Sequence, residues 1–404
     1  MEIKYEYFFG ALLGHAIGDA LGAPIEGLYM SRIKPLISKL NIPYSFKNLQ
    51  AINKTIRGKD RINPGLHTDD TQYMLVLLES IQYNDKTGYE YNIKKSLELF
   101  RKLIGVKIPG SRTGAIRGAG RNARTSFFRL LRNEPLNKIG TDSAGVGSAM
   151  RIGPPALLFM GNPKNLCEYV IKSSIITHLN VAGISAGYAE ALLMIECYKL
   201  SKVISNSKNV DNDTKYGILE KIINLTMEFE NNLLDKVEEI FPSTQFIINS
   251  EPIYKNLVSS AISEVLEINK MNINSTRAVK LILTKYKARK PSGFAPVGIA
   301  IAFYQVLKYL TEPVLGLCKT MELGGDTDTI GAMVGGPLFA ANGQNKIPKL
   351  WKDKLYIYDY LKEKATSLLN RGNQKISTNS KKLIEVETEL TRLLFNFQSK
   401  LKIQ

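Results

Sequence analysis

Cysteine and histidine are scarce in this sequence of 404 residues, with three of each. The cysteines are Cys167, Cys197 and Cys318. Their odd number, wide spacing and lack of a C-x-x-C motif argue against a disulfide framework and against cysteine-based zinc or redox sites. Buried free thiols in a reducing compartment are therefore expected. Three histidines supply a zinc site poorly, so any bound metal is expected to take oxygen ligands.

Acidic residues are also few, because 37 Asp and Glu stand against 54 Lys and Arg, which leaves a formal net charge of +17. This excess favours an anionic partner, namely a nucleotide, a nucleic acid or an acidic protein surface. Between Arg101 and Arg132 there are nine basic residues and no acidic one. The segment is either a solvated basic face or a rim that attracts phosphates. Its only aromatic residues, Phe127 and Phe128, argue against a platform for single-stranded nucleic acid.

An uninterrupted apolar run long enough for a membrane span is missing. The stretch from Tyr7 to Pro24 resembles a signal or membrane segment until His15 and Asp19 interrupt it. Glu2 and Glu6 replace the basic residues that precede the apolar part of a signal peptide. The sequence therefore predicts an intracellular protein without a membrane partner.

Strand patterns are nearly absent, and the apolar residues, 44% of the chain, recur mostly at helical spacing. We expect an all-α fold with one main domain over residues 1–370, in which 199–290 is a variable helical segment without recognisable chemistry. Residues 371–380 are predicted to be a polar linker. Residues 381–404 are predicted to form an amphipathic helix that either docks on the main domain or pairs with another chain, and docking is the expectation.

Glycine recurs at every fourth position from Gly10 to Gly22, which places the glycines along one side of a helix. Each glycine costs about 1 kcal/mol relative to alanine inside a helix, so a compensating contact is expected. The natural partner is the small-residue helix that contains Gly331 and Gly335, and residues 182–187 offer a third surface of this kind. These surfaces predict tight helix packing.

Two clusters of threonine and aspartate stand where helices are predicted to begin. The first comprises Thr68, Asp69 and Asp70, and the second comprises Asp326, Asp328 and Thr329. Such residues are ordinary helix caps. They are also the hard oxygen ligands that Mg²⁺ prefers, and two such helix starts facing each other would form a two-metal site. An EF-hand loop is excluded because Ile330 and Pro337 occupy ligand positions.

Five motifs, in order, resemble those of the ADP-ribosylglycohydrolase family: GDALGAPIEG, HTDDTQ, GVGSAMRIGP, THLN and GGDTDTIGAMVGGPLFAANG. The resemblance implies a compact, orthogonal multi-helix bundle with two Mg²⁺ ions at its centre, which removes ADP-ribose from modified side chains or small molecules. It implies metal ligation by Thr68, Asp69, Asp70, Asp326, Asp328 and Thr329. It also implies a catalytic role for Glu26 and a pocket formed by Gly147, Ser148, His178 and the Arg117–Gly118 turn. Asp142 is a candidate second acid.

The sequence departs from the family pattern at His67, where an aromatic residue is usual, and at Val146 and Ala119, where an amide and an aromatic residue are usual. These changes leave the ligand acids intact and alter the contacts to substrate. Two further functions stay open, namely a catalytically silent binding or structural protein, as in crystallins, and a basic nucleic-acid binder.

Overall fold

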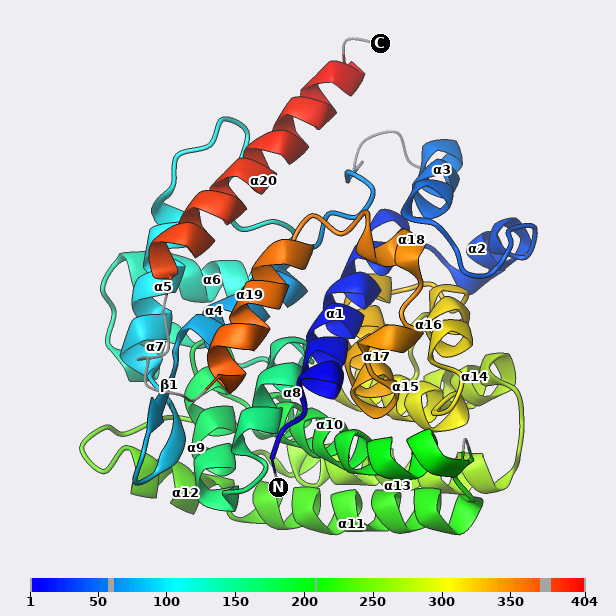
Figure 1. The fold of residues 1–404 in the computed structure, drawn as a ribbon. Helices are drawn as coiled ribbons and strands as arrows, with labels where there is room; N and C mark the ends of the chain where they lie inside the picture. Colours follow the sequence, from blue (N-terminus) through cyan, green and yellow to red (C-terminus); the bar gives the residue numbers. More distant parts are fainter. Residues whose placement is uncertain (1, 57–61, 208, 371–378, 403–404) are drawn as a thin grey trace.

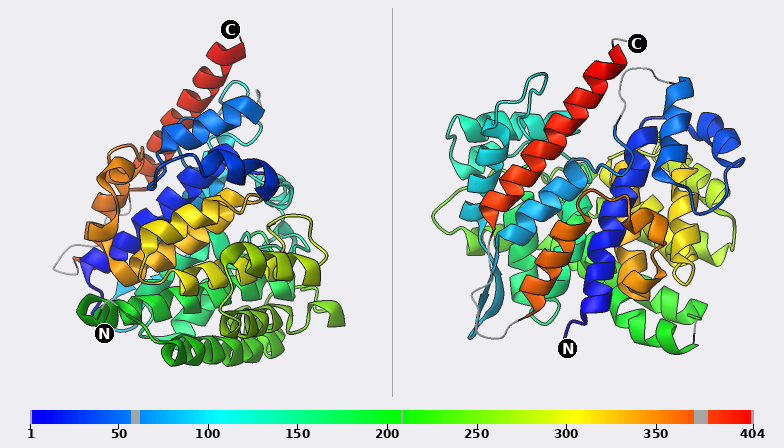
Figure 2. Two further views of the ribbon diagram at one scale, coloured as in Figure 1. Left: turned by 90° about the vertical axis from the view of Figure 1, so that its right-hand side faces the viewer. Right: turned by 45° about the horizontal axis from the view of Figure 1, so that its top comes forward.

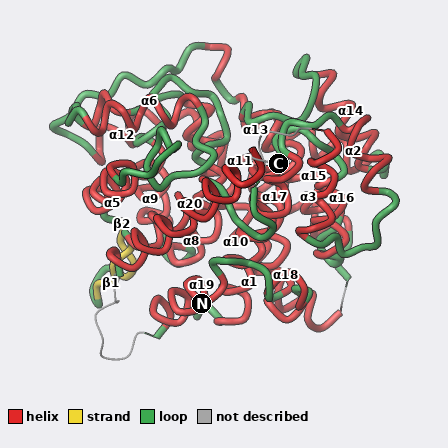
Figure 3. The backbone as a smooth tube through the Cα atoms, turned by 90° about the horizontal axis from the view of Figure 1, so that it is seen from above, coloured by secondary structure: helices red, strands yellow, loops and turns green. Residues whose placement is uncertain are grey.

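The computed structural model describes residues 2–56, 62–207, 209–370 and 379–402. Over these residues the chain forms 20 α-helices, four short 3₁₀ helices and two short strands, which confirms the all-α class. Helices make up most of the body, loops connect them, and the two strands lie at one edge (Figure 3).

Helix α1 (Tyr5–Gly22) runs through the centre of the molecule beside α17 (Thr327–Asn342) (Figure 1). By length and composition, the segment Tyr5–Ile25 could cross a membrane, but 94% of its most apolar window is buried inside the protein, as in a core helix. The predicted glycine packing is confirmed. A Cβ atom on Gly18 would lie 2.0 Å from the carbonyl oxygen of Gly331, so the two backbones touch directly.

Helix α10 (Val181–Ser207) packs against both α17 and α8 (Ala149–Ala156). Here too small residues permit close approach, because a Cβ atom on Gly183 would lie 2.2 Å from the carbonyl oxygen of Ser143. The contact holds the segment that leads into α8 against the core. Helix α15 (Ala295–Lys308) also contacts α10 and α17.

The predicted variable segment 199–290 begins inside α10, and the helices that follow α10, over residues 212–285, form a layer on the core. Helix α11 packs against α10 and α13, and α13 packs against α15, so the layer covers the side of α10 (Figure 1). Its helices are α11 (Asn212–Asn231), α12 (Leu233–Ile240), α13 (Leu257–Lys270) and α14 (Ser275–Lys285). Helix α11 begins where the Asp211 side chain accepts a hydrogen bond from the Thr214 N–H, a standard N-cap.

The remaining helices surround this core. They are α2 (Met30–Ile37), α3 (Phe46–Ile56), α4 (Asp69–Glu79), α5 (Ile93–Gly105), α6 (Arg121–Leu131), α7 (Leu136–Ile139), α9 (Pro163–Ser174), α16 (Pro313–Met321), α18 (Lys349–Lys352), α19 (Tyr358–Leu369) and α20 (Ser380–Lys402). The 3₁₀ helices are η1 (Ala23–Ile25), η2 (Leu157–Phe159), η3 (Pro252–Tyr254) and η4 (Gln344–Lys346).

One antiparallel hairpin interrupts the helical pattern. Strand β1 (Ile81–Asn84) pairs with β2 (Gly88–Tyr91) in the register Ile81 opposite Tyr91. Gly88 has a φ of 80°, which a turn residue without Cβ adopts easily. The sequence did not predict this hairpin, since strands of four residues are too short to show a clear alternation.

The C-terminal helix α20 docks on the body against α4 and α5, as expected, and its far end projects away from the body (Figures 1 and 2). The observed helix starts one residue before the predicted 381. Residues 371–378 of the predicted linker lie outside the described residues.

Candidate active site

Four helices, α4, α6, α8 and α17, begin at one cavity of about 340 Å³, and the first turn of each helps to line it. None of the four has a side-chain hydrogen bond at its N-cap. A helix N-terminus carries free N–H groups and a partial positive charge. This convergence therefore favours negatively charged groups in the cavity.

Five carboxylates line the cavity. Glu26 follows the η1 turn after α1, Asp69 and Asp70 open α4, and Asp326 and Asp328 stand at the start of α17. Oxygen atoms of Glu26, Asp326 and Asp328 lie within 4.8 Å of one another. The fold thus brings together both of the acidic helix starts that the sequence suggested, together with the turn acid.

Two glycine turns hold Glu26 beside Asp326. Gly27 and Gly325 have φ angles of 78° and 80°, in the left-handed region that favours glycine. The Gly27 N–H donates to the Gly325 carbonyl at 2.6 Å, and the Gly325 N–H donates to the Leu28 carbonyl at 2.7 Å. Since the main chains of the two turns bond to each other, their acids are held at the same end of the cavity.

The residues at the start of α4 bond mainly to Asp19 of α1, although the Thr68 hydroxyl also lies 3.2 Å from Asp70 Oδ2. Thr68 stands at the N-cap but makes no side-chain cap bond. Its N–H and hydroxyl donate to the Asp19 carboxylate at 2.9 and 2.7 Å, and those of Thr71 do so at 3.0 and 2.6 Å. Asp19 is fully buried. The core helix therefore fixes the position of Asp69 and Asp70.

Burial raises the pKa of the aspartates in the cavity. That of Asp69 reaches about 8, chiefly through loss of solvation and then through the charge of Asp19. Burial also raises the pKa of Asp326 and puts those of Asp70 and Asp328 well above the ordinary value. Among the described residues, Asp70 Oδ1 finds no hydrogen-bond partner. Crowded, buried carboxylates of this kind fit a divalent cation, which offsets their charge and prefers oxygen ligands.

The cavity has a second wall of basic and neutral polar groups. Arg121 belongs to the first turn of α6, and the buried Arg151 belongs to that of α8. His178 lines the same cavity, and burial, followed by the charge of Arg151, lowers its pKa to about 3. The imidazole is therefore neutral at pH 7, and its Nδ1 lies 2.7 Å from Thr177 Oγ1. This wall suits a polar, anionic ligand.

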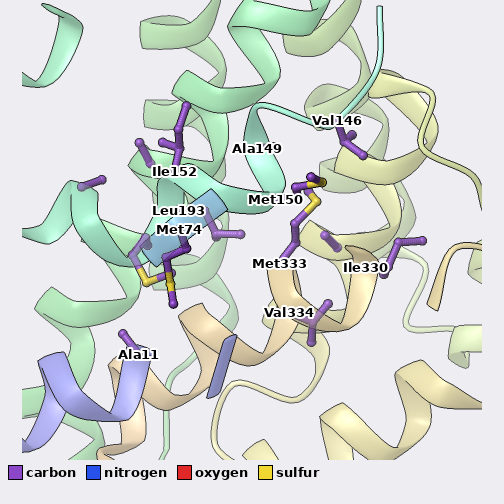
Figure 4. Close-up of a cluster of buried hydrophobic side chains, with 14 of the residues drawn as sticks. Ala11, Met74, Val146, Ala149, Met150, Ile152, Leu193, Ile330, Met333 and Val334 are labelled. Carbon is purple, nitrogen blue, oxygen red and sulfur yellow. The ribbon is translucent and has the colours of Figure 1, made fainter. Parts of the chain in front are cut away.

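Apolar side chains complete the cavity. Val146 and Met150 line it and belong to the hydrophobic core. Figure 4 shows Met150 beside Met333 of α17 and Val146 on the segment before α8. Both side chains therefore join the cavity wall to the packed interior, which limits how far α8 and α17 can shift relative to each other.

Most residues predicted from the sequence lie at this cavity. Those that line it are Glu26, Asp69, Asp70, Gly118, Gly147, His178, Asp326, Asp328 and Thr329. Two others lie behind its wall, since the Thr68 hydroxyl donates to Asp19 and the Ser148 hydroxyl donates to the Gly183 carbonyl.

Asp142 does not line this cavity. It is exposed and borders a different, open cavity of about 950 Å³. Its carboxylate accepts hydrogen bonds from Asn180 Nδ2 at 2.7 Å and from Asn249 Nδ2 at 2.8 Å. These bonds fix two chain segments to each other, and the predicted second acid stands apart from the five carboxylates of the cavity.

Arg117 also differs from its prediction as a substrate-binding residue. Its side chain is 1% exposed, and its Nη2 lies 2.8 Å from Oε2 of Glu387 on α20. The basic segment as a whole is not a rim of the cavity. Arg129 donates to the carbonyls of Lys138 and Gly140, and of the nine basic residues Arg121 alone lines the cavity.

Asp19, Tyr73 and Arg151 are among the residues of the site that were not singled out from the sequence. Asp19 carried a usable signal, because a charged residue inside an apolar helix needs buried partners. Tyr73 and Arg151 looked like ordinary helix residues, and only the direction in which the fold turns them brings them to the cavity.

The chain resembles known proteins over most of its length. The sequence model of the family described as ADP-ribosylglycohydrolase matches residues 2–377. An uncharacterised protein of Archaeoglobus fulgidus is 26% identical over 369 residues, covering 90% of this chain and 96% of the relative. ADP-ribosylhydrolase ARH3 of Xenopus tropicalis is 24% identical over 361 residues, covering 85% of this chain and 89% of the relative.

Two more matches cover different extents. ADP-ribosyl-[dinitrogen reductase] glycohydrolase of Rhodospirillum rubrum is 29% identical over 172 residues, which are 42% of this chain and 50% of that protein. A solved structure described as an ADP-ribosylglycohydrolase-related protein complex has a TM-score of 0.54 at 20% identity and covers 92% of this chain and 99% of its own. The fold is therefore shared, and the family match over residues 2–377 shows that this chain belongs to the ADP-ribosylglycohydrolase family.

Proposed function

We propose that this protein is a Mg²⁺-dependent hydrolase that cleaves the glycosidic bond between ADP-ribose and a modified protein side chain or a small ADP-ribosyl compound. The observation that carries the proposal is the convergence of five carboxylates and four helix N-termini on one cavity. A cavity of about 340 Å³ lies within the size range of small-molecule sites. Family membership supports the substrate class.

The proposal places two Mg²⁺ ions among the oxygen donors around the cavity. The residues that would hold them are Thr68, Asp69, Asp70, Asp326, Asp328 and Thr329. Although the Thr68 hydroxyl donates its hydrogen to Asp19, the lone pairs of its oxygen stay available to a cation. When bound, such ions polarise substrate oxygens and lower the pKa of a coordinated water molecule.

Glu26 is the residue to which we assign the proton transfer. Unlike the buried Asp70 and Asp328, it is exposed, and its carboxylate stands at the acidic end of the cavity. In our proposal, Glu26 accepts a proton from a water molecule whose oxygen bonds to the anomeric carbon of the ribose. The bond from that carbon to the leaving group breaks with its electron pair, and the leaving group takes a proton from solvent.

The second wall would hold the diphosphate. The N-terminus of α6 offers N–H groups, and Arg121 adds a positive charge. The neutral imidazole of His178 can hydrogen-bond to a sugar hydroxyl or a phosphate oxygen without adding charge. This arrangement leaves the acidic end of the cavity to the ribose.

The test is release of ADP-ribose from arginine-linked and serine-linked substrates, in Mg²⁺ and in EDTA. We expect release from at least one substrate in Mg²⁺ and none in EDTA, with Asp328→Asn as the inactive control. Release that is equal in EDTA would refute the metal dependence. An absence of both release and ADP-ribose binding would refute the function.

One observation favours a second function, that of an ADP-ribose-binding protein without turnover. Val146 puts an apolar side chain in the cavity wall, where its methyl groups face Gly293 and Gly298 and cannot hydrogen-bond to a ligand. Calorimetry separates the two functions, because tight binding of ADP-ribose without release from either substrate would support the silent protein.

A further inference from the structure

Helix α20 lies beyond residues 2–377, where the family match ends, yet it places a charge in the interior of the protein. Glu387 on α20 is fully buried. Its Oε1 lies 3.0 Å from His67 Nε2, and its Oε2 lies 2.8 Å from Arg117 Nη2. Gln72 Nε2 donates to Oε2 at 2.7 Å. Both oxygens of a single carboxylate are therefore engaged by residues of the main domain.

Arg117 is held on every side by the same cluster. Its Nε donates to the His67 carbonyl at 3.0 Å, and its Nη1 donates to Thr391 Oγ1 on α20 at 2.9 Å. The Thr391 hydroxyl donates in turn to the Ala115 carbonyl at 2.7 Å. Burial alone would raise the pKa of Glu387, but Arg117 and His67 lower it to about 2, so the carboxylate is ionised at neutral pH.

The cluster lies directly behind the cavity. His67 precedes Thr68, the N-cap of α4, and Gln72 belongs to the first turns of that helix. The Arg117 N–H donates to Gln72 Oε1 at 2.7 Å, and Arg117 precedes Gly118, which lines the cavity. A Cβ atom on Gly118 would lie 2.8 Å from Oδ1 of Asp69. The turn therefore packs against a predicted metal ligand.

Apolar contacts of α20 cover the two segments that lead into this cluster. Leu394 packs with Ile62 and Leu66, which belong to the segment that leads to His67. The ring of Phe395 lies against Gly110, since a Cβ atom there would be 3.0 Å from the ring. The helix is thus attached to both segments by side chains that follow Glu387 and Thr391 along α20.

We propose that Glu387 is a positioning residue, through which α20 holds the start of α4 and the Gly118 turn in the geometry that the cavity needs to bind a divalent cation. The proposal rests on the proposed function for its cation. Glu387 makes no direct contact with substrate in this proposal, because it acts through His67, Gln72 and Arg117.

Glu79 offers a matched control at the opposite end of α4. It is buried, its Oε1 lies 2.9 Å from Nζ of Lys364 on α19, and it accepts a hydrogen bond from the Tyr360 hydroxyl at 2.8 Å. Glu387→Gln and Glu79→Gln each remove one buried carboxylate charge beside a cation while keeping the side-chain size. Only the first change touches the cluster behind the cavity.

Two measurements on the full chain test the proposal. The first is the Mg²⁺ concentration that gives half of the maximal rise in melting temperature, which we expect to increase at least tenfold in Glu387→Gln and less than twofold in Glu79→Gln. The second is hydrogen exchange of the amides at Thr68, Thr71 and Arg117, which should quicken in Glu387→Gln alone. Equal changes in the two variants would overturn the positioning role.

The two readouts also separate this proposal from the proposed function. If Mg²⁺ does not raise the melting temperature of the unchanged protein, the metal-dependent function fails, while exchange at the three amides still decides whether Glu387 positions them. Should Glu387→Gln not fold, Thr391→Val removes the hydrogen bonds that Thr391 makes with Arg117 and with the Ala115 carbonyl, and it keeps the ion pair. Faster exchange at Arg117 in that variant supports the proposal, and unchanged exchange overturns it.

Discussion

Replacing Gly18 by alanine should force α1 and α17 apart. The new Cβ would lie 2.0 Å from the Gly331 carbonyl oxygen and 2.3 Å from its carbon, whereas ordinary van der Waals contact starts at 3.4 Å. Both atoms belong to the backbone, so no side-chain rotation relieves the overlap. The helices would have to separate by roughly 1 Å or more, which disturbs a well-packed core.

The magnitude follows from two opposing effects. Overpacking of a core costs about 1–3 kcal/mol and occasionally more, and contact between two backbones puts Gly18 at the upper end of this range. Alanine recovers about 1 kcal/mol because it favours the helix. The expected net loss is about 2 kcal/mol. At an unfolding entropy of about 2.1 cal/mol/K per residue, this loss lowers the melting temperature of a 404-residue chain by about 2–3 °C.

Gly217 provides the control, since it lies in α11, is exposed, and a Cβ there would meet nothing within 4 Å. Gly217→Ala should therefore raise the free energy of unfolding by about 0.5–1 kcal/mol, through helix propensity alone. Urea denaturation of both variants, followed by circular dichroism, measures the two effects. Equal free energies of unfolding for Gly18→Ala and Gly217→Ala would refute the close backbone contact between α1 and α17.

Three further predictions concern the cavity. Asp328→Asn should bind Mg²⁺ more weakly and lose orders of magnitude in the rate of hydrolysis. Glu26→Gln, at an exposed position, should lose turnover with a smaller change in the Mg²⁺ affinity measured by calorimetry. A larger loss of Mg²⁺ affinity in Glu26→Gln than in Asp328→Asn would exchange their roles. In EDTA, the melting temperature should fall as the pH rises from about 4 to 8, because the raised pKa of folded Asp69, about 8, lets it keep a proton that the unfolded chain releases. Saturating Mg²⁺ should cancel this fall. An effect of Mg²⁺ on the melting temperature that does not depend on pH would contradict the assignment. Arg121→Gln should weaken ADP-ribose binding, and more so at low than at high salt. Arg132→Gln, outside the cavity, should leave ADP-ribose binding unchanged. Equal losses of affinity in the two variants would point to a nonspecific effect of charge.

The sequence by itself determined the helical class and one central packing contact. Apolar residues at helical spacing predicted the helices, and glycine at every fourth position predicted the contact between α1 and α17. Both signals are local, since they depend on spacing within a single element. The acids of the cavity were recognisable for the same reason, because Asp69 and Asp326 stand beside threonines at predicted helix starts.

Tertiary structure alone decided which distant groups meet. Asp19 could be recognised as an unusual charge, but its partners Thr68 and Thr71 are about 50 positions away, and Arg117 meets Glu387 across 270 positions. No local pattern encodes such pairs, because the partner of a buried charge depends on how whole helices pack. For this reason the sequence pointed to the five acids that meet at the cavity, but it could not show that Asp142 stands outside it or that Arg117 turns away from it toward the C-terminal helix.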